Sequence, residues 1–184
     1  MDSEKLLVIS DTHGEIPALT TVLKWAKGYG VGAAAFLGDG IHDMSEATAA
    51  AGFSPTVKMV RGNSDRAESV PLPEAAFMDF AGHRFFLCHG HRYSLHGNFN
   101  TLIAAARNNK ADAALFGHTH VPFSKTINGL LLVNPGSVSR PRSNIGATFA
   151  IIECLPKMPL KATFWIITPA KSFEQEFQIN PCEP

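Results

Sequence analysis

Short apolar runs alternate with polar loops along the first third of the chain. A β-prone run at residues 6–10 ends at a polar loop, and the Ala-, Leu- and Lys-rich stretch 16–27 that follows predicts a helix. The order returns with a strand at 33–37, a helix near 44–51 and a third strand at 56–60. Repeated strand and helix units favour a parallel α/β sheet, in which the polar loops gather at the carboxyl ends of the strands.

The pattern changes from Glu74 onward, where β-like runs predominate. Two turn signals stand out: Ala81-Gly82-His83 predicts a tight hairpin, and Asn128-Gly129 is a strong signal for another. The tail from residue 169 onward has no clear period, so no element is predicted there. The elements predicted in this half are a helix at 98–108 and strands at 75–80, 84–88, 113–116, 121–127, 130–133, 147–154 and 161–167.

Composition describes an ordinary globular protein, with 45% hydrophobic and 17% charged residues. A length of 184 residues favours one domain spanning 1–184. Sixteen basic against sixteen acidic residues give no net charge, which disfavours a specific nucleic acid partner or a membrane surface. No apolar run approaches a membrane span. Three cysteines without a CxxC pair favour a reducing, cytoplasmic location.

The polar loops that follow the predicted strands carry residues suited to metal binding. Asp-x-His places a carboxylate and an imidazole within reach of one ion, and His-x-His does the same with two imidazoles. Without thiolates, these ligands suit Mn, Fe, Zn, Ni or Co. The set is too large for one tetrahedral ion. Its members are Asp11, His13, Asp39, Asn63, His89, His91, His118 and His120.

This ordered set of loops resembles the calcineurin-like metallophosphoesterase family. The short length and the stretch Asn134-Pro135-Gly136-Ser137 resemble its small YfcE-like phosphodiesterase branch. The resemblance implies an α/β fold class: a four-layer α-β-β-α sandwich of two mixed β-sheets, with the site at strand ends along one edge. It also implies two divalent metal ions per chain, with Mn preferred and Fe, Zn, Ni, Co or Mg as alternatives.

The resemblance implies a role for each ligand position. Asp39 would bridge the two ions, because a carboxylate binds two cations and offsets their charge. A hydroxide shared by the ions would then attack phosphorus in line, with no side-chain nucleophile. The first ion would be held by Asp11, His13 and His120, and the second by Asn63, His89 and His118.

Two further histidines are candidate catalytic residues. His91 completes the family's His-Gly-His, and we expect it either to contact the substrate phosphate directly or to hydrogen-bond a ligand carboxylate. His42 follows the Gly-Asp loop and is close enough in sequence to reach the substrate, with a solvated loop histidine as the alternative. Arg140 and Arg142, after the Asn-Pro-Gly-Ser stretch, are candidates to approach a substrate phosphate.

The chain departs from many larger members of the superfamily at one position. In those proteins a histidine that can protonate the leaving group follows the metal-binding Asn, whereas Asn63 is followed here by Ser64 and Asp65. Asp65 is therefore a third candidate catalytic residue, as a weak acid, with support of a ligand or no role as alternatives. We expect poor protonation of the leaving group, which favours diesters with good leaving groups.

These observations predict a metal-dependent phosphoesterase, foremost a phosphodiesterase acting on a small phosphodiester substrate. A phosphomonoesterase is the alternative among enzymes. The alternative from another class is a non-catalytic protein-assembly scaffold, because a eukaryotic retromer subunit shares the family's fold. Assembly into a homo-oligomer is left open by the sequence.

Overall fold

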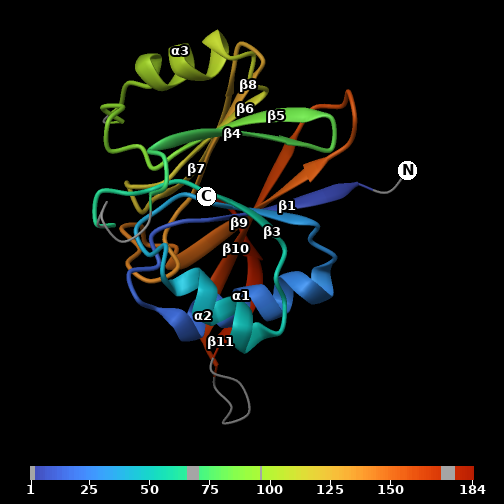
Figure 1. Ribbon diagram of the computed structural model, residues 1–184, viewed down its shortest axis with the longest axis vertical. Coiled ribbons are helices and arrows are strands. Elements are labelled where there is room, and N and C mark those ends of the chain that lie inside the picture. The colour runs from blue at the N-terminus through green and yellow to red at the C-terminus, as the bar shows by residue number, and fades with distance from the viewer. Residues whose placement is uncertain (1–2, 66–70, 96, 171–176) are drawn as a thin grey trace.

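The computed structural model describes residues 3–65, 71–95, 97–170 and 177–184, and these form two mixed β-sheets (Figure 1). In the six-stranded sheet, the three N-terminal strands run parallel to one another and the three C-terminal strands pair antiparallel. Its order is β11 (Phe177–Cys182), β10 (Lys161–Pro169), β9 (Ala147–Cys154), β1 (Glu4–Ile9), β2 (Ala33–Phe36) and β3 (Thr56–Met59).

The five-stranded sheet has a parallel centre with one antiparallel strand at each edge. Its order is β4 (Ala75–Phe80), β5 (His83–Cys88), β6 (Ala113–Phe116), β8 (Leu130–Pro135) and β7 (Pro122–Ile127). The hairpin between β7 and β8 turns at Asn128 and Gly129, with φ of 47° and 83°. Both angles are positive, as the predicted two-residue turn requires.

Helices cover the two outer faces of the paired sheets. The helices α1 (Ile16–Tyr29) and α2 (Asp43–Ala51) lie on the six-stranded sheet, and α3 (Asn100–Asn108) lies on the five-stranded sheet (Figure 1). The predicted four-layer α-β-β-α sandwich is therefore confirmed. Among the described helices, none has the length and hydropathy that crossing a bilayer would need.

The central strands are buried on both faces. In β1, Leu6 and Val8 belong to the apolar layer between the sheets, whereas Leu7 and Ile9 pack with the residues of α1. Strands covered on both faces contain continuous apolar runs rather than an alternating pattern, which explains the runs seen in the sequence.

Most predicted elements are confirmed to within two residues at each end, and 75–80, 113–116 and 147–154 match fully. The prediction missed β11, which lies in the tail at the edge of the six-stranded sheet. Only half-buried and exposed residues occur along β11, so it lacks the apolar run that reveals a strand.

Candidate metal centre

Unusual backbone conformations are concentrated in the loops that carry the predicted ligands. Non-glycine residues rarely adopt positive φ, because the Cβ atom then crowds the backbone, and such strain persists where surrounding contacts hold the chain. Five predicted ligands have this conformation: Asp11 (57°), His13 (44°), Asp39 (58°), His118 (68°) and His120 (59°).

Glycines allow the loops after β2 and β3 to touch. A Cβ atom on Gly62 would collide with the Asp39 side chain, and one on Gly38 would collide with the Gly62 backbone. These two positions therefore require glycine for the chain to bring the Asp39 and Asn63 loops together.

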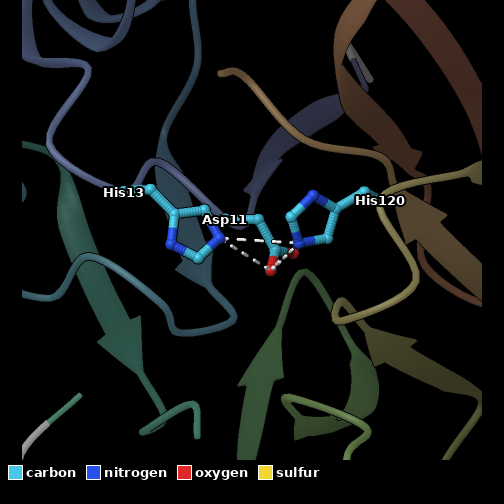
Figure 2. A group of neighbouring side chains, drawn as sticks. All are labelled: Asp11, His13 and His120. Atoms are coloured by element: carbon cyan, nitrogen blue, oxygen red, sulfur yellow. Dashed lines mark hydrogen bonds and ion pairs between the residues drawn. The ribbon is translucent and has the colours of Figure 1, made fainter. Parts of the chain in front are cut away.

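Two imidazoles, from His13 and His120, converge on one carboxylate oxygen of Asp11 (Figure 2). The Nε2 atom of His120 lies 3.1 Å from Oδ1 of Asp11, and Nε2 of His13 lies 3.8 Å from the same oxygen. The two Nε2 atoms are 3.5 Å apart. The structure thus brings together the set that the resemblance implies for the first ion.

A second group lies directly beside the first. Nε2 of His89 is 3.1 Å from Oδ1 of Asn63 and 3.5 Å from Oδ2 of Asp39. The Asp39 oxygen is also 3.8 Å from Nε2 of His13, so this carboxylate lies between the groups. His118 is adjacent, with its ring centroid 5.2 Å from that of His89.

The residues fit the metal ions that the fold family implies. The Asp11 side chain is fully buried, and in the described part of the chain its Oδ1 atom makes no hydrogen bond of good geometry, although Nε2 of His120 lies 3.1 Å away. Leaving a buried carboxylate oxygen without a donor is costly. A cation would satisfy this oxygen, and carboxylate, imidazole and amide groups are the ligands that borderline divalent metals accept.

Backbone carbonyls orient two of the imidazoles. Nδ1 of His89 lies 2.8 Å from the carbonyl oxygen of Leu37, and Nδ1 of His120 lies 2.6 Å from that of Arg140. A carbonyl oxygen only accepts, so each Nδ1 donates and carries the proton. Each Nε2 atom is thereby turned toward Asp11, the orientation that a metal ligand requires.

The pKa values of several candidate ligands are shifted in directions that favour cation binding. Burial raises the pKa of Asp11, but His120 and His89 outweigh it and leave that pKa lowered, so the carboxylate is charged. Burial lowers the pKa of His13 and of His118, which keeps both imidazoles neutral at physiological pH. Neutral imidazoles and an ionised carboxylate are the forms that bind metal. The pKa of His120 moves the other way, because the neighbouring Asp11 carboxylate raises it.

Asp65 makes contacts that disfavour an acid role. Its carboxylate accepts backbone N–H groups of Asp39 (2.7 Å), Gly40 (2.8 Å), Ile41 (3.1 Å) and Gly62 (2.9 Å). Burial raises its pKa, but these four donors outweigh burial and leave the pKa lowered. Asp65 therefore stays ionised and joins two ligand loops, which fits the alternative of ligand support.

The other two catalytic candidates lie differently. His91 is half-buried, with its ring centroid 5.5 Å from that of His89 and 6.2 Å from that of His118, so the structure brings it to the site. His42 is exposed at the start of α2, and among the described contacts its side chain has no hydrogen bond to the ligand group. Their catalytic roles stay predictions.

Sequence reasoning missed two residues that hold the ligand loops. Ser64 donates to both Asp39 oxygens, from its backbone N–H to Oδ1 (2.8 Å) and from its hydroxyl to Oδ2 (2.9 Å). The Asp43 carboxylate accepts the Gly14 N–H at 2.8 Å and the Thr12 hydroxyl. A short polar residue near a loop is too common a signal to reveal either role.

The Asn-Pro-Gly-Ser stretch lies beneath the ligand loops. The Ser137 hydroxyl donates to the backbone oxygen of Asp11 at 2.8 Å, and the Asn134 amide donates to that of Gly117 at 2.8 Å. Both side chains are fully buried. This stretch therefore fixes the backbone on either side of the first ligand group.

A cavity of about 430 Å³ opens over the ligands. Arg140 and Arg142 line it together with ligands of both groups, so two positive side chains stand beside the predicted metal positions. Such a cavity can receive a phosphate, because guanidinium groups bind its oxygens through paired N–H donors.

Comparison with known proteins identifies the class. The model of the calcineurin-like phosphoesterase superfamily domain matches residues 5–157, and the chain therefore belongs to that superfamily. Its sequence is similar to phosphodiesterase YfcE of Escherichia coli, with 29% identity over 167 residues that cover 81% of this chain and 87% of YfcE. The predicted family is thus confirmed.

Solved structures share the fold. A predicted phosphoesterase from Streptococcus pneumoniae superposes with a TM-score of 0.75 and 25% identity, covering 99% of both chains. Vps29 from Entamoeba histolytica, solved in complex with zinc, superposes with a TM-score of 0.71 and 21% identity, covering 97% of this chain and 98% of Vps29. The likeness to Vps29 concerns the fold alone.

Proposed function

We propose that this member of the superfamily is a phosphodiesterase with a dinuclear metal centre. One observation carries the proposal: two ligand groups share the space around the buried Asp11 carboxylate, with Asp39 between them, and both open onto a cavity lined by Arg140 and Arg142. A pair of ions and two nearby arginines suit a phosphoryl group.

Bound divalent ions would supply Lewis acidity to a phosphoryl oxygen and lower the pKa of a water molecule that attacks phosphorus. The chain's own residues position the reactants. Arg140 and Arg142 orient the phosphate from the cavity wall. Ser64 and Asp65 hold the loops that carry Asp39 and Asn63, so the ligands need little rearrangement on binding.

The proposed substrate is a small phosphodiester with a good leaving group. Asp65, the candidate acid after Asn63, is ionised and already accepts four backbone N–H groups. His91 borders the site, but burial lowers its pKa, so it is neutral at physiological pH. Neither group assists the departure of a strongly basic alkoxide well, which disfavours alkyl phosphomonoesters.

The proposal also covers the identity of the metal and the cellular location of the enzyme. Manganese is the proposed metal, with Fe, Zn, Ni, Co or Mg as alternatives, because the ligand set lacks thiolates. We also propose a cytoplasmic location, since Cys88, Cys154 and Cys182 are all free thiols.

A protein-assembly scaffold is the second candidate. It is supported by the shared fold with Vps29, a vacuolar protein sorting protein. The site favours catalysis, because the ligand groups line a cavity together with Arg140 and Arg142, where a phosphate can bind.

The deciding experiment measures hydrolysis of bis(p-nitrophenyl) phosphate by Mn²⁺-loaded protein. Asp39→Ala and His89→Ala should each lower kcat/KM by at least about a hundredfold. Asp79→Ala is the matched control, because Asp79 is 71% exposed and pairs with Arg84. Equal rates in all four proteins would sink the catalytic assignment.

Two further measurements separate the alternatives. A parallel assay with p-nitrophenyl phosphate distinguishes a diesterase from a monoesterase, which would prefer the monoester. Metal analysis of loaded, desalted protein should find about two ions per chain, and fewer than about 0.2 would contradict a metal centre.

A further inference from the structure

A second cavity lies beside the one over the metal ligands. It measures about 510 Å³, against about 430 Å³ for the first. His118 and Arg142 line both cavities, so the two spaces meet at these residues. The walls that the argument uses are His91, Leu95, His118, Thr119, Val121 and Arg142.

Two apolar side chains, Leu95 and Val121, line this second cavity. Val121 is 39% exposed, and among the described residues the only other exposed large hydrophobic side chain is Met158. Leu95 lines the same cavity and is mostly buried. A Cβ atom on Gly90 would come within 2.7 Å of Leu95, so glycine at this position lets Leu95 reach the wall. An exposed apolar side chain beside a reaction centre suggests a ligand that covers it.

Polar groups also line the cavity. Arg142 stands where the two cavities meet, and Thr119 is held by the Asn134 amide at 2.9 Å. Ligand sites of several hundred Å³ typically combine apolar walls with a few fixed polar groups, as here. A guanidinium also stacks on aromatic faces, which an alkyl group does not offer.

We propose that the second cavity binds an aromatic ester group of the substrate while the phosphate occupies the first. The substrate class would then be phosphodiesters with an aryl or nucleoside group rather than purely alkyl diesters. This inference rests on the proposed function. The ring lies against Leu95 and Val121, and Arg142 contacts both the ring and the phosphate, which explains why it lines both cavities.

Equilibrium binding of three phosphonates to the Mn²⁺-loaded protein tests the proposal by calorimetry. Methyl-, cyclohexyl- and phenylphosphonate carry the same phosphonate group, and their P–C bond is not hydrolysed; the titrations are run at a pH where all three are dianions. We expect phenylphosphonate to bind about tenfold or more tightly than methylphosphonate, because the ring leaves water. We expect it to bind about threefold more tightly than cyclohexylphosphonate, because Arg142 stacks on an aromatic face.

Two matched variants locate the ring. Val121→Asn should reduce the preference for phenyl over methyl at least about threefold, whereas Met158→Asn should leave it unchanged, since Met158 lies outside the cavity walls. An equal effect of both variants would overturn the proposal.

The binding experiment also separates this inference from the proposed function. Equal affinities for methyl- and phenylphosphonate would overturn the aromatic subsite and leave the diesterase standing. Equal affinities for cyclohexyl- and phenylphosphonate would overturn the aromatic specificity in the same way. If loaded protein bound none of the three ligands, the phosphoryl site itself would fail, and this inference with it.

Discussion

The Asp65 carboxylate accepts the backbone N–H of Asp39 at 2.7 Å, although the two residues belong to different strand-end loops. Asp65 follows β3, and Asp39 follows β2. The same carboxylate accepts the N–H of Gly62 in its own loop at 2.9 Å. One side chain thus fixes the distance between the loops of two predicted metal ligands, Asp39 and Asn63.

Asp65→Asn should lower the free energy of unfolding of the metal-free protein by about 2–3 kcal/mol, measured with urea. The amide introduced at position 65 would offer one acceptor oxygen in place of two. Its NH₂ group would face backbone N–H donors, which would lose their acceptor. The folded pKa of Asp65 lies below the unfolded value near 3.8. Its stabilisation is therefore full above that value and is lost as the pH falls through the folded pKa.

A pH series and a control variant test this prediction further. The stability difference between parent and Asp65→Asn should stay constant from about pH 8 to about pH 5 and shrink in stronger acid. Asp79→Asn, which removes an exposed charge, should cost less than about 0.5 kcal/mol. A parent and an Asp65→Asn variant of equal stability at neutral pH would contradict the structural role.

Ser64→Ala should weaken Mn²⁺ binding about tenfold, because the Ser64 hydroxyl orients the Asp39 carboxylate at 2.9 Å. The unfolding free energy of the metal-free protein should change by less than about 1.5 kcal/mol. Calorimetric titration with Mn²⁺ measures the affinity. Ser45→Ala is the control, since that exposed hydroxyl donates to the His42 carbonyl, and an equal loss in both variants would refute the assignment.

Metal binding should stabilise the fold. At a free Mn²⁺ concentration of 100 times the dissociation constant, linkage predicts about 2.7 kcal/mol, which corresponds to a rise in Tm of roughly 5–10 °C for a chain of this size. His13→Ala should lose most of this shift, because His13 contacts both Asp11 and Asp39. His42→Ala, which alters an exposed histidine, should keep it. Scanning calorimetry with and without chelator decides between these outcomes.

The fold was largely predictable because most of its strands are visible in the sequence as short apolar runs. Apolar runs at 6–10, 33–37 and 113–116 reflect strands buried on both faces, and each ends at a polar loop. The strand β11 could not be predicted, because its residues are half-buried or exposed and it pairs along one edge only. Burial is not the whole reason, because β3 is equally exposed and lies at the other edge of the sheet, yet it was predicted from its β-prone run at 56–60.

The candidate ligands were also predictable from type and order, and ligand support was one alternative for Asp65, but the contacts that Asp65 and Asp43 make were not predictable. Asp11 and His13 stand in a motif with a chemical meaning. Asp43 and Asp65 are single carboxylates whose roles depend on backbone N–H groups brought near by folding, Gly14 for the first and Gly40 for the second. A single sequence carries no local signal for contacts across 25 or more residues.

Arg140→Ala should lower kcat/KM for bis(p-nitrophenyl) phosphate by about 10- to 100-fold, because the guanidinium lines the cavity over the ligands. The backbone oxygen that holds His120 at 2.6 Å remains, so metal affinity should stay within about twofold of the parent. Arg140→Lys keeps the charge but loses the paired donors. The kcat/KM of this variant should therefore lie between that of the parent and that of Arg140→Ala.

Whether the loss in kcat/KM appears in kcat or in KM then shows whether Arg140 acts in the bound substrate or in the transition state. If it contacts the phosphate equally in the bound substrate and in the transition state, its removal raises KM alone; if it meets charge that develops during attack, kcat falls. We expect kcat to fall, because charge on the phosphoryl oxygens is redistributed as the attacking oxygen approaches. Arg107→Ala is the control, since that side chain bonds the Ile127 and Asn128 carbonyls at the hairpin, and a matching fall in kcat there would remove Arg140 from the reaction.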